Sequence, residues 1–243
     1  MKSAIQELKA NLERDYLLRR YQKLVSGQIP LEDRLIDAAA KVYIQSILSW
    51  RVFVKRALDI SVSLTGIILG LPLLAVIAVA VKLSSSGPVF YSQTRVGQKG
   101  KLFQIYKFRS MRQDAETKSG PVWAKENDPR VTKVGDFLRK THLDELPQLF
   151  NVLSGEMSVV GPRPERPHFV KELRQQIPHY DKRHYAKPGI TGLAQIKRRY
   201  DDSIDDVKKK VRYDVLYIKK MCPFLDVKVI ALTAFTVILK TGR

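Results

Sequence analysis

The sequence predicts an α/β fold that is mainly helical, contains a small β element and is attached to a membrane. Apolar residues recur at helical spacing through most of the chain, and strand-like alternation is confined to a short stretch in its middle. Residues 60–81 are 22 consecutive positions without a charge, long enough to enter a bilayer. The 243 residues carry a formal net charge of +19. That excess predicts an anionic partner, which is nucleic acid, an anionic membrane surface or phosphorylated substrates.

Residues 1–50 are predicted to form an N-terminal helical extension of two helices. The break falls at residues 26–30 (Ser-Gly-Gln-Ile-Pro), and the second helix starts at Pro30 or just after it. The stretch holds no chemical motif, so it suggests a packing or oligomerisation hairpin and a possible homodimer. It has no apolar core of a secretory signal, and the single cysteine, Cys222, excludes an intramolecular disulfide. We therefore expect a cytoplasmic protein, unless another segment takes it to a membrane.

Residues 51–83 are predicted to be that membrane segment. As a helix, the 22 uncharged residues would be about 33 Å long, enough to cross a bilayer core of about 30 Å. A spanning helix is one interpretation. A bent, re-entrant helix is favoured, because Pro72 near the middle removes a backbone hydrogen bond and because basic residues on both flanks prefer the cytoplasmic side. These flanking residues are Arg51, Lys55, Arg56, Lys82, Arg95, Lys99 and Lys101.

Residues 84–243 are predicted to form a cytoplasmic catalytic domain that begins with strands. Within residues 103–109 the strand period of two puts Lys107 and Arg109 on one face, away from the aromatic residues between them. Two cations on one face are common at an exposed surface, but beside groups that handle phosphate they are a candidate diphosphate clamp. For Trp123 three interpretations stay open: covering a core edge, base stacking, or anchoring at a membrane interface.

Asp144 and Glu145 lie side by side just ahead of a helical apolar run. Such a pair often only complements the helix dipole, and an arginine between two prolines, like Arg163 between Pro162 and Pro164, often marks a plain surface turn. Their combination with the basic strand instead indicates a site for a phosphate and a divalent cation. Glu145 offers the hard oxygen that Mg²⁺ prefers, the fork of Arg163 suits a phosphate, and Asp144 is the candidate nucleophile.

The remaining segments are predicted to be mostly helical. Residues 165–185 carry a modest apolar stripe, residues 186–196 form a glycine-containing loop, and residues 200–217 form a helix with acids at its start. The apolar stretch at residues 224–239 is short for a membrane span. We interpret it as an amphipathic helix that lies in the membrane interface or packs on the core.

Four motifs, in this order, resemble the monotopic phosphoglycosyl transferases, a family of bacterial sugar transferases. The resemblance covers residues 51–243. Larger members carry further membrane helices and another domain before this region, and we expect that architecture to be absent here. The motifs are Lys-Phe-Arg-Ser-Met at 107–111, Leu-Asp-Glu-Leu-Pro-Gln-Leu at 143–149, Met-Ser-Val-Val-Gly-Pro-Arg-Pro at 157–164 and Lys-Pro-Gly-Ile-Thr-Gly at 187–192.

This resemblance implies a monotopic membrane protein with a proline-broken re-entrant helix, working at the cytoplasmic face of the bacterial inner membrane. Asp144 would take up a phosphosugar from a UDP-sugar with loss of UMP, and a polyprenyl phosphate would then attack it. Glu145 would be the Mg²⁺ ligand and Arg163 the arginine of the phosphate site. The product would begin the assembly of a surface glycan. The family pattern more often has serine where this chain has His142, which favours a cap or surface role for that histidine.

Two other functions stay open. A glycosyltransferase that moves only the sugar would release UDP, but the sequence has no long doubly wound pattern, and Asp-x-Asp spacing occurs only in the solvated-looking run at residues 201–206. A basic module without catalysis would suit the charge and the apolar segment, yet it leaves the acidic pair unexplained. The aromatic residues do not form stacking platforms, so nucleic acid is not the expected partner. No residue indicates which sugar is moved.

Overall fold

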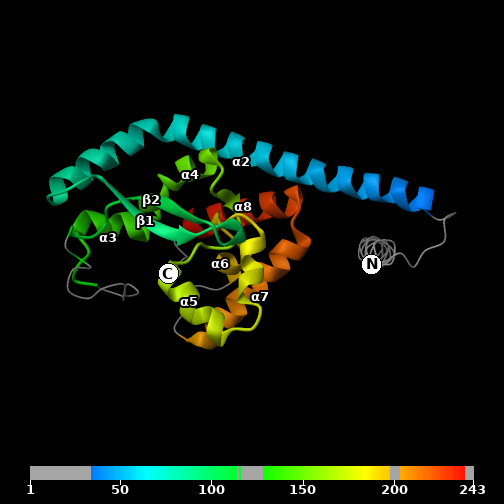
Figure 1. Ribbon diagram of the computed structural model, residues 1–243. Helices are drawn as coiled ribbons and strands as arrows, with labels where there is room; N and C mark the ends of the chain where they lie inside the picture. Colours follow the sequence, from blue (N-terminus) through cyan, green and yellow to red (C-terminus); the bar gives the residue numbers. More distant parts are fainter. Residues whose placement is uncertain (1–33, 114, 116–127, 198–202, 239–243) are drawn as a thin grey trace. The chain divides into compact units, whose positions relative to one another are not determined.

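The computed structural model describes residues 34–113, 115, 128–197 and 203–238 (Figure 1). The chain divides into two compact units, Met1–Val54 and Lys55–Arg243. In the first unit residues 34–54 are helical, and the rings of Trp50 and Phe53 stack with their centroids 6.1 Å apart. The first helix and the break expected within residues 1–33 lie outside the described residues, as does Trp123.

Helix α2 (Arg34–Ser84) is a single helix of 51 residues that continues through Pro72. The expected second N-terminal helix and the expected membrane helix are therefore one element. Figure 1 shows that its later half bends, in the part coloured cyan to teal. Its stretch Trp50–Ser84 is long and apolar enough to cross a membrane, by length and composition. The re-entrant course, in which the bend returns the chain to the same membrane face, stays a prediction.

Two small sheets make up the β element of the described residues. Strands β1 (Phe90–Val96) and β2 (Leu102–Phe108) pair antiparallel from Phe90↔Phe108 to Val96↔Leu102, with the 3-10 turn η2 (Gln98–Gly100) between them. Strands β3 (Ser158–Val160) and β4 (Gly189–Thr191) pair in parallel. The predicted fold class, mainly helical with a small β element, is thus confirmed for the described residues.

The other helices follow in short pieces. They are α3 (Lys133–Lys140), the 3-10 turn η3 (Leu143–Glu145), α4 (Gln148–Ser154), α5 (Pro167–Gln176), the 3-10 turn η4 (Tyr180–Tyr185), α6 (Leu193–Lys197), α7 (Ile204–Lys220) and α8 (Pro223–Ile238). The helical prediction for residues 165–185 misses a break at Ile177–His179, where His179 has a left-handed φ of 61°. The helix expected from residue 200 begins at Ile204, because the hydroxyl of Ser203 accepts the backbone N–H of Asp206 as an N-cap.

Three groups of buried side chains form the core of the second unit. The first joins α5 and α7 to the end of β1, and the second joins β2, α4, β3 and α7 to Val229 of α8. The third packs Ile77 and Val81 of α2 against Phe108 and Leu138. Helix α8 therefore packs on the core through one face, while Phe224 and Phe235 remain 80% and 61% exposed.

Polar side chains at the start of the apolar half of α2 bond to residues of β3 and α8. Lys55 donates to the carboxylate of Asp226 at 2.8 Å and to the backbone carbonyl of Val160 at 3.0 Å. Asp59, which is 3% exposed, accepts from the backbone N–H of Val159 at 2.9 Å. Burying these groups is tolerated because each has a partner. Together they hold α2 beside β3 and α8.

Candidate active site

The acidic pair lies in the tight turn η3, between α3 and α4. His142 precedes the turn in a left-handed conformation (φ 56°), which redirects the chain after α3. Its imidazole is exposed and makes no capping hydrogen bond, so the structure supports the surface role for His142 and not the cap. Both acids are buried, Asp144 at 7% and Glu145 at 9% exposure. Glu145 has charged partners, whereas no hydrogen bond or ion pair joins Asp144 to another described residue, so the two buried carboxylates differ in environment.

Glu145 is held by two cations from different parts of the chain. Its Oε1 accepts from Lys107 Nζ at 2.6 Å, and its Oε2 accepts from Arg163 Nη1 at 3.2 Å. Burial alone would raise the pKa of Glu145, but the charges of Arg163 and Lys107 outweigh it and hold that pKa well below its usual value. Glu145 is therefore ionised at neutral pH, and the predicted residues Lys107, Glu145 and Arg163 form one cluster.

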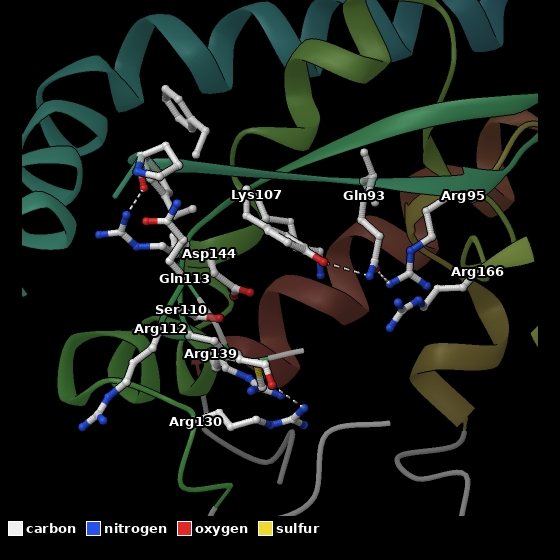
Figure 2. Close-up of a pocket in the computed structure, with 18 of the residues that line it drawn as sticks. Gln93, Arg95, Lys107, Ser110, Arg112, Gln113, Arg130, Arg139, Asp144 and Arg166 are labelled. Carbon is white, nitrogen blue, oxygen red and sulfur yellow. Dashed lines mark hydrogen bonds between the residues drawn. The ribbon is translucent and has the colours of Figure 1, made fainter. Parts of the chain in front are cut away.

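Asp144 points into a pocket. No hydrogen bond or ion pair joins its carboxylate to another described residue, and Figure 2 shows it between Lys107 and Arg139. Burial raises the pKa of Asp144, and the nearby charge of Lys107 opposes that rise. A carboxylate with little solvation and no partner keeps its lone pairs available, which is what a nucleophile requires.

The pocket has a volume of about 330 Å³ and a strongly basic wall. Asp144 is the one acidic residue among the described residues that line it, against seven cations: Arg95, Lys107, Arg109, Arg112, Arg130, Arg139 and Arg166. Aromatic and apolar side chains, including Phe90, Phe108 and Phe169, complete the lining. A pocket of this size and charge suits a small organic phosphate better than a neutral ligand.

Arg109 does not share the position of Lys107. Strand β2 ends at Phe108, and the guanidinium of Arg109 turns back to the end of α2, where it donates to the carbonyls of Val81 at 3.1 Å, Ser85 at 2.6 Å and Pro88. Val81 belongs to the last turn of α2, where carbonyls lack a partner within the helix, and Ser85 and Pro88 follow the helix end. The contacts of Arg109 thus secure the C-terminus of α2, and its part in a diphosphate clamp with Lys107 stays a prediction.

Arg139 is a residue that sequence reasoning missed. It comes from the last turn of α3, its side chain lines the pocket, and its guanidinium bonds to none of the described residues. Its charge acts on the Asp144 carboxylate. In the sequence it looks like an ordinary cation at a helix C-terminus, so only its position five residues before Asp144 could have drawn attention to it.

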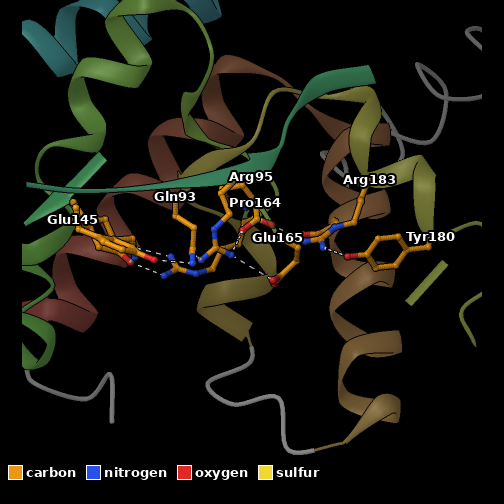
Figure 3. Close-up of polar contacts among 11 residues, drawn as sticks. Gln93, Arg95, Glu145, Pro164, Glu165, Tyr180 and Arg183 are labelled. Carbon is orange, nitrogen blue, oxygen red and sulfur yellow. Dashed lines mark hydrogen bonds and ion pairs between the residues drawn. The ribbon is translucent and has the colours of Figure 1, made fainter. Parts of the chain in front are cut away.

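The Pro162–Pro164 segment is held along its length, unlike a plain surface turn. Its two prolines have no N–H to donate, and four successive carbonyls are bonded instead. The backbone N–H groups of Gly189 and Val96 donate to the carbonyls of Pro162 and Glu165, each at 2.9 Å. Arg183 Nη2 donates to the carbonyl of Arg163 at 2.9 Å, and Arg95 Nη1 donates to that of Pro164 at 3.2 Å. Figure 3 shows both arginine side chains near Pro164. Sequence reasoning found the late glycine loop that supplies Gly189 but missed Arg95 and Arg183.

The described residues contain no group of three or more His, Cys, Asp or Glu side chains arranged to hold a metal ion. Asp144 and Glu145 are nevertheless two adjacent carboxylates of the kind that Mg²⁺ uses when substrate phosphates supply its other ligands. The donor set is compatible with Mg²⁺ on that condition, although Glu145 already carries two cations.

Residues 50–240 match the family model described as bacterial sugar transferase. The chain is 45% identical over 190 residues to the UDP-N-acetylgalactosamine-undecaprenyl-phosphate N-acetylgalactosaminephosphotransferase of Aeromonas hydrophila, covering 78% of this chain and 45% of that protein. It is 49% identical over 183 residues to the UDP-glucose:undecaprenyl-phosphate glucose-1-phosphate transferase of Escherichia coli, covering 74% and 39%. It is 41% identical over 184 residues to an exopolysaccharide production protein of Rhizobium leguminosarum, covering 72% and 90%. The chain thus spans less than half the length of the first two relatives and most of the third.

Proposed function

We propose that this chain, which belongs to the bacterial sugar transferase family, transfers a sugar 1-phosphate from a UDP-sugar to undecaprenyl phosphate or a similar polyprenyl phosphate. The reaction would take place at the cytoplasmic face of the bacterial inner membrane and begin the assembly of a surface glycan. Two relatives are named for this type of transfer, with different sugars. Identity to them therefore supports the acceptor and the reaction type, and leaves the sugar open.

In the first step the carboxylate of Asp144 attacks the phosphorus that bears the sugar. A bond forms between a carboxylate oxygen and this phosphorus, and the bond from the phosphorus to the bridging oxygen of the diphosphate breaks. The electron pair leaves with UMP, and the enzyme holds an acyl-phosphate that carries the sugar. The position of Asp144 in a basic pocket, without a hydrogen-bonding partner among the described residues, supports this role.

In the second step a phosphate oxygen of the polyprenyl phosphate attacks the same phosphorus. The acyl-phosphate bond breaks, the Asp144 carboxylate is restored, and a polyprenyl-diphosphosugar is formed. Both substrates are anions, so each step needs cations around the phosphoryl group. Lys107 and Arg163 pair with the carboxylate of Glu145, next to Asp144. Arg139 lines the pocket and has no partner among the described residues, so we assign Arg139 to the donor diphosphate.

We propose Mg²⁺ as the cofactor, held by Glu145 and the donor phosphates. When bound, it would neutralise phosphate charge. Removal of divalent cations with EDTA should then abolish UMP release, and added Mg²⁺ should restore it. Full activity in EDTA would exclude this proposal, and the cations of the pocket would then be sufficient.

The single observation that carries the proposed function is Asp144, unpaired among the described residues in a pocket with seven cations, beside a fully paired Glu145. The test uses detergent-purified protein, polyprenyl phosphate, Mg²⁺ and a panel of UDP-sugars, with UMP and UDP measured separately. We expect UMP with at least one sugar, and no UMP from Asp144→Asn. Asp136→Asn is the matched control, because Asp136 is half exposed on α3 and pairs only with Lys140 among the described residues.

The same assay separates the alternatives. UDP in place of UMP would mean that only the sugar moves, as in a glycosyltransferase, and Asp144 would not be a nucleophile toward phosphorus. Neither nucleotide, from folded protein that stays on membranes, would indicate a basic membrane-binding module. Trapping of labelled sugar phosphate on the protein, absent from Asp144→Asn, would identify the covalent intermediate directly.

A further inference from the structure

Arg163 reaches Glu145 from the Pro162–Glu165 segment, whose backbone carbonyls accept the hydrogen bonds that hold it in place. Three of the four carbonyls from Pro162 to Glu165 are bonded by groups of β1 or by the backbone at the start of β4. The carbonyl of Arg163 itself accepts from the side chain of Arg183, whose Nη2 lies 2.9 Å away. The backbone carbonyl of Arg163 is therefore held by the guanidinium of a second arginine, Arg183.

Arg183 is itself fixed by buried partners. Only 6% of it is exposed, its Nε and Nη2 lie 3.0 Å and 2.8 Å from Asp214 Oδ2, and its Nη1 donates to the Tyr180 hydroxyl at 2.7 Å. Asp214 comes from the middle of α7 and is 2% exposed. Figure 3 shows Arg183 between Tyr180 and the Pro164–Glu165 segment.

A buried ion pair of this kind is a poor way to gain stability. Removing two charges from water costs about as much as their attraction returns, and apolar side chains of similar volume often pack as stably. What the pair supplies is direction, since the planar guanidinium with both Nε and Nη2 on Asp214 leaves Nη2 aimed at one carbonyl.

We propose that Arg183, held by Asp214, is a positioning residue that fixes the backbone of Arg163 and so aims its guanidinium at Glu145 and the transferring phosphoryl group. This rests on the proposed function. A shift of about 1 Å in a group that contacts the transition state can cost about a hundredfold in rate, so a small loss of hold on Arg163 should be measurable.

The test is a double-mutant cycle with Arg183→Lys and Arg163→Lys. Lysine keeps the positive charge beside Asp214, but all its N–H donors are on one nitrogen. It therefore cannot bond to Asp214 and to the Arg163 carbonyl with the geometry of the guanidinium. We expect Arg183→Lys to lower kcat about tenfold or more in the native background, and less than about twofold when Arg163 is already lysine. Equal losses in the two backgrounds would overturn the proposal and leave Arg183 as a fold residue alone.

Two further variants separate positioning from stability. Tyr180→Phe removes one hydrogen bond of Arg183 and leaves the Arg163 carbonyl contact, so it should lower Tm with kcat unchanged; a loss of kcat equal to that of Arg183→Lys would argue against positioning. Arg174→Lys is the matched control, because Arg174 pairs with Asp181 at an exposed site, and it should change neither value. Should Arg183→Lys fail to fold, Asp214→Asn takes its place in the same cycle.

The outcome is distinguishable from a failure of the proposed function. The cycle can be repeated on the dissociation constant of a UDP-sugar, measured by calorimetry in an Asp144→Asn background that does not turn over. Coupling between positions 183 and 163 in binding would support the positioning role even if the native protein released UDP. Additive effects in both binding and turnover would overturn it.

Discussion

The two adjacent acids illustrate how neighbouring side chains of the same chemistry acquire different roles. Glu145 bonds to Lys107 and Arg163, whereas Asp144 lines the pocket and bonds to neither of them. Their pKa values consequently move in opposite directions, that of Glu145 down and that of Asp144 up. Environments that separate the pKa values of paired carboxylates commonly mark a division of chemical roles.

Asp144→Asn should make the folded protein more stable while it abolishes turnover. Burial raises the pKa of Asp144, so its ionised form is less favourable in the folded state than in the unfolded one. The folded state then binds more protons, and stability falls as pH rises from the usual aspartate value through the raised one. Asparagine removes that cost at neutral pH. Thermal unfolding in detergent checks this, and a Tm below that of the native protein would contradict it.

Glu145→Gln should lower stability, and the loss should depend on pH in the opposite sense. The depressed pKa of Glu145 means that its contribution is fully present above the unfolded value near 4.5 and is lost as pH falls through the lower folded value. At pH 7 the variant leaves Lys107 and Arg163 without their charged partner, which should cost about 1–3 kcal/mol. Denaturant titrations at pH 7 and below pH about 4 measure the difference; a cost that does not shrink in acid would show that the ion pairs are not its origin.

The sequence sufficed to predict which charged residues gather around Glu145, since Lys107 and Arg163 stood out by motif. Arg139 and Arg183 did not, because nothing local distinguishes them from cations on a solvated helix or loop. Arg109 was assigned to the same face as Lys107 on the assumption that the strand continued, and β2 ends one residue earlier. Strand alternation predicts the face on which a side chain lies. It does not predict which other elements that side chain contacts, because those contacts depend on tertiary packing.

Elements of three residues decide the geometry of the site, and they could not be predicted from alternation. Strands β3 and β4 are too short to show a period of two, yet they bring the Pro162–Pro164 segment beside the late glycine loop. Their approach depends on glycine, since a Cβ on Gly189 would lie 2.1 Å from the backbone nitrogen of Gly161. By contrast, the long helices and the apolar stretch were evident from the sequence, because their patterns extend over many residues.

Gly189→Ala should therefore separate β3 from β4. The added methyl group meets backbone on both sides and cannot be relieved by a rotamer change, so a loss of about 3 kcal/mol or more is expected, together with loss of activity. Gly70→Ala is the control, because nothing lies within 4 Å of its Cβ in α2, and there alanine should gain up to about 1 kcal/mol from helix propensity. Thermal unfolding of both variants checks this, and similar Tm shifts would contradict the role assigned to the close approach.

At the scale of the whole chain, the net charge of +19 and the apolar half of α2 supply two different attractions to a membrane. Charge attraction to anionic lipids is screened at about 1 M salt, where the Debye length is about 3 Å, whereas burial of apolar surface is not. We expect the protein to stay in the membrane fraction after a wash at about 1 M salt and to be released by detergent. Release by salt alone would mean that α2 does not insert.

Labelling of single cysteines should distinguish a re-entrant helix from a spanning one. In a Cys222→Ser background, Val52→Cys and Ser86→Cys place exposed thiols near the two ends of the apolar stretch. A re-entrant helix leaves both thiols on the cytoplasmic side, so a membrane-impermeant maleimide should label neither in intact spheroplasts and both in inverted vesicles. Labelling of one thiol in spheroplasts would establish a spanning helix and contradict the re-entrant proposal.

Hydrogen bonds join the apolar half of α2 to the rest of the second unit at two places, through Lys55 and Asp59 at its start and through Arg109 at its end. If this half lies in the membrane, the two attachments fix the height of Asp144 above the lipid tails. Turnover would then depend on the position of the acceptor phosphate relative to the membrane surface and not on the length of the polyprenyl tail. Polyprenyl phosphates with different numbers of isoprene units should accordingly give similar kcat values, provided that each is long enough to partition into the bilayer.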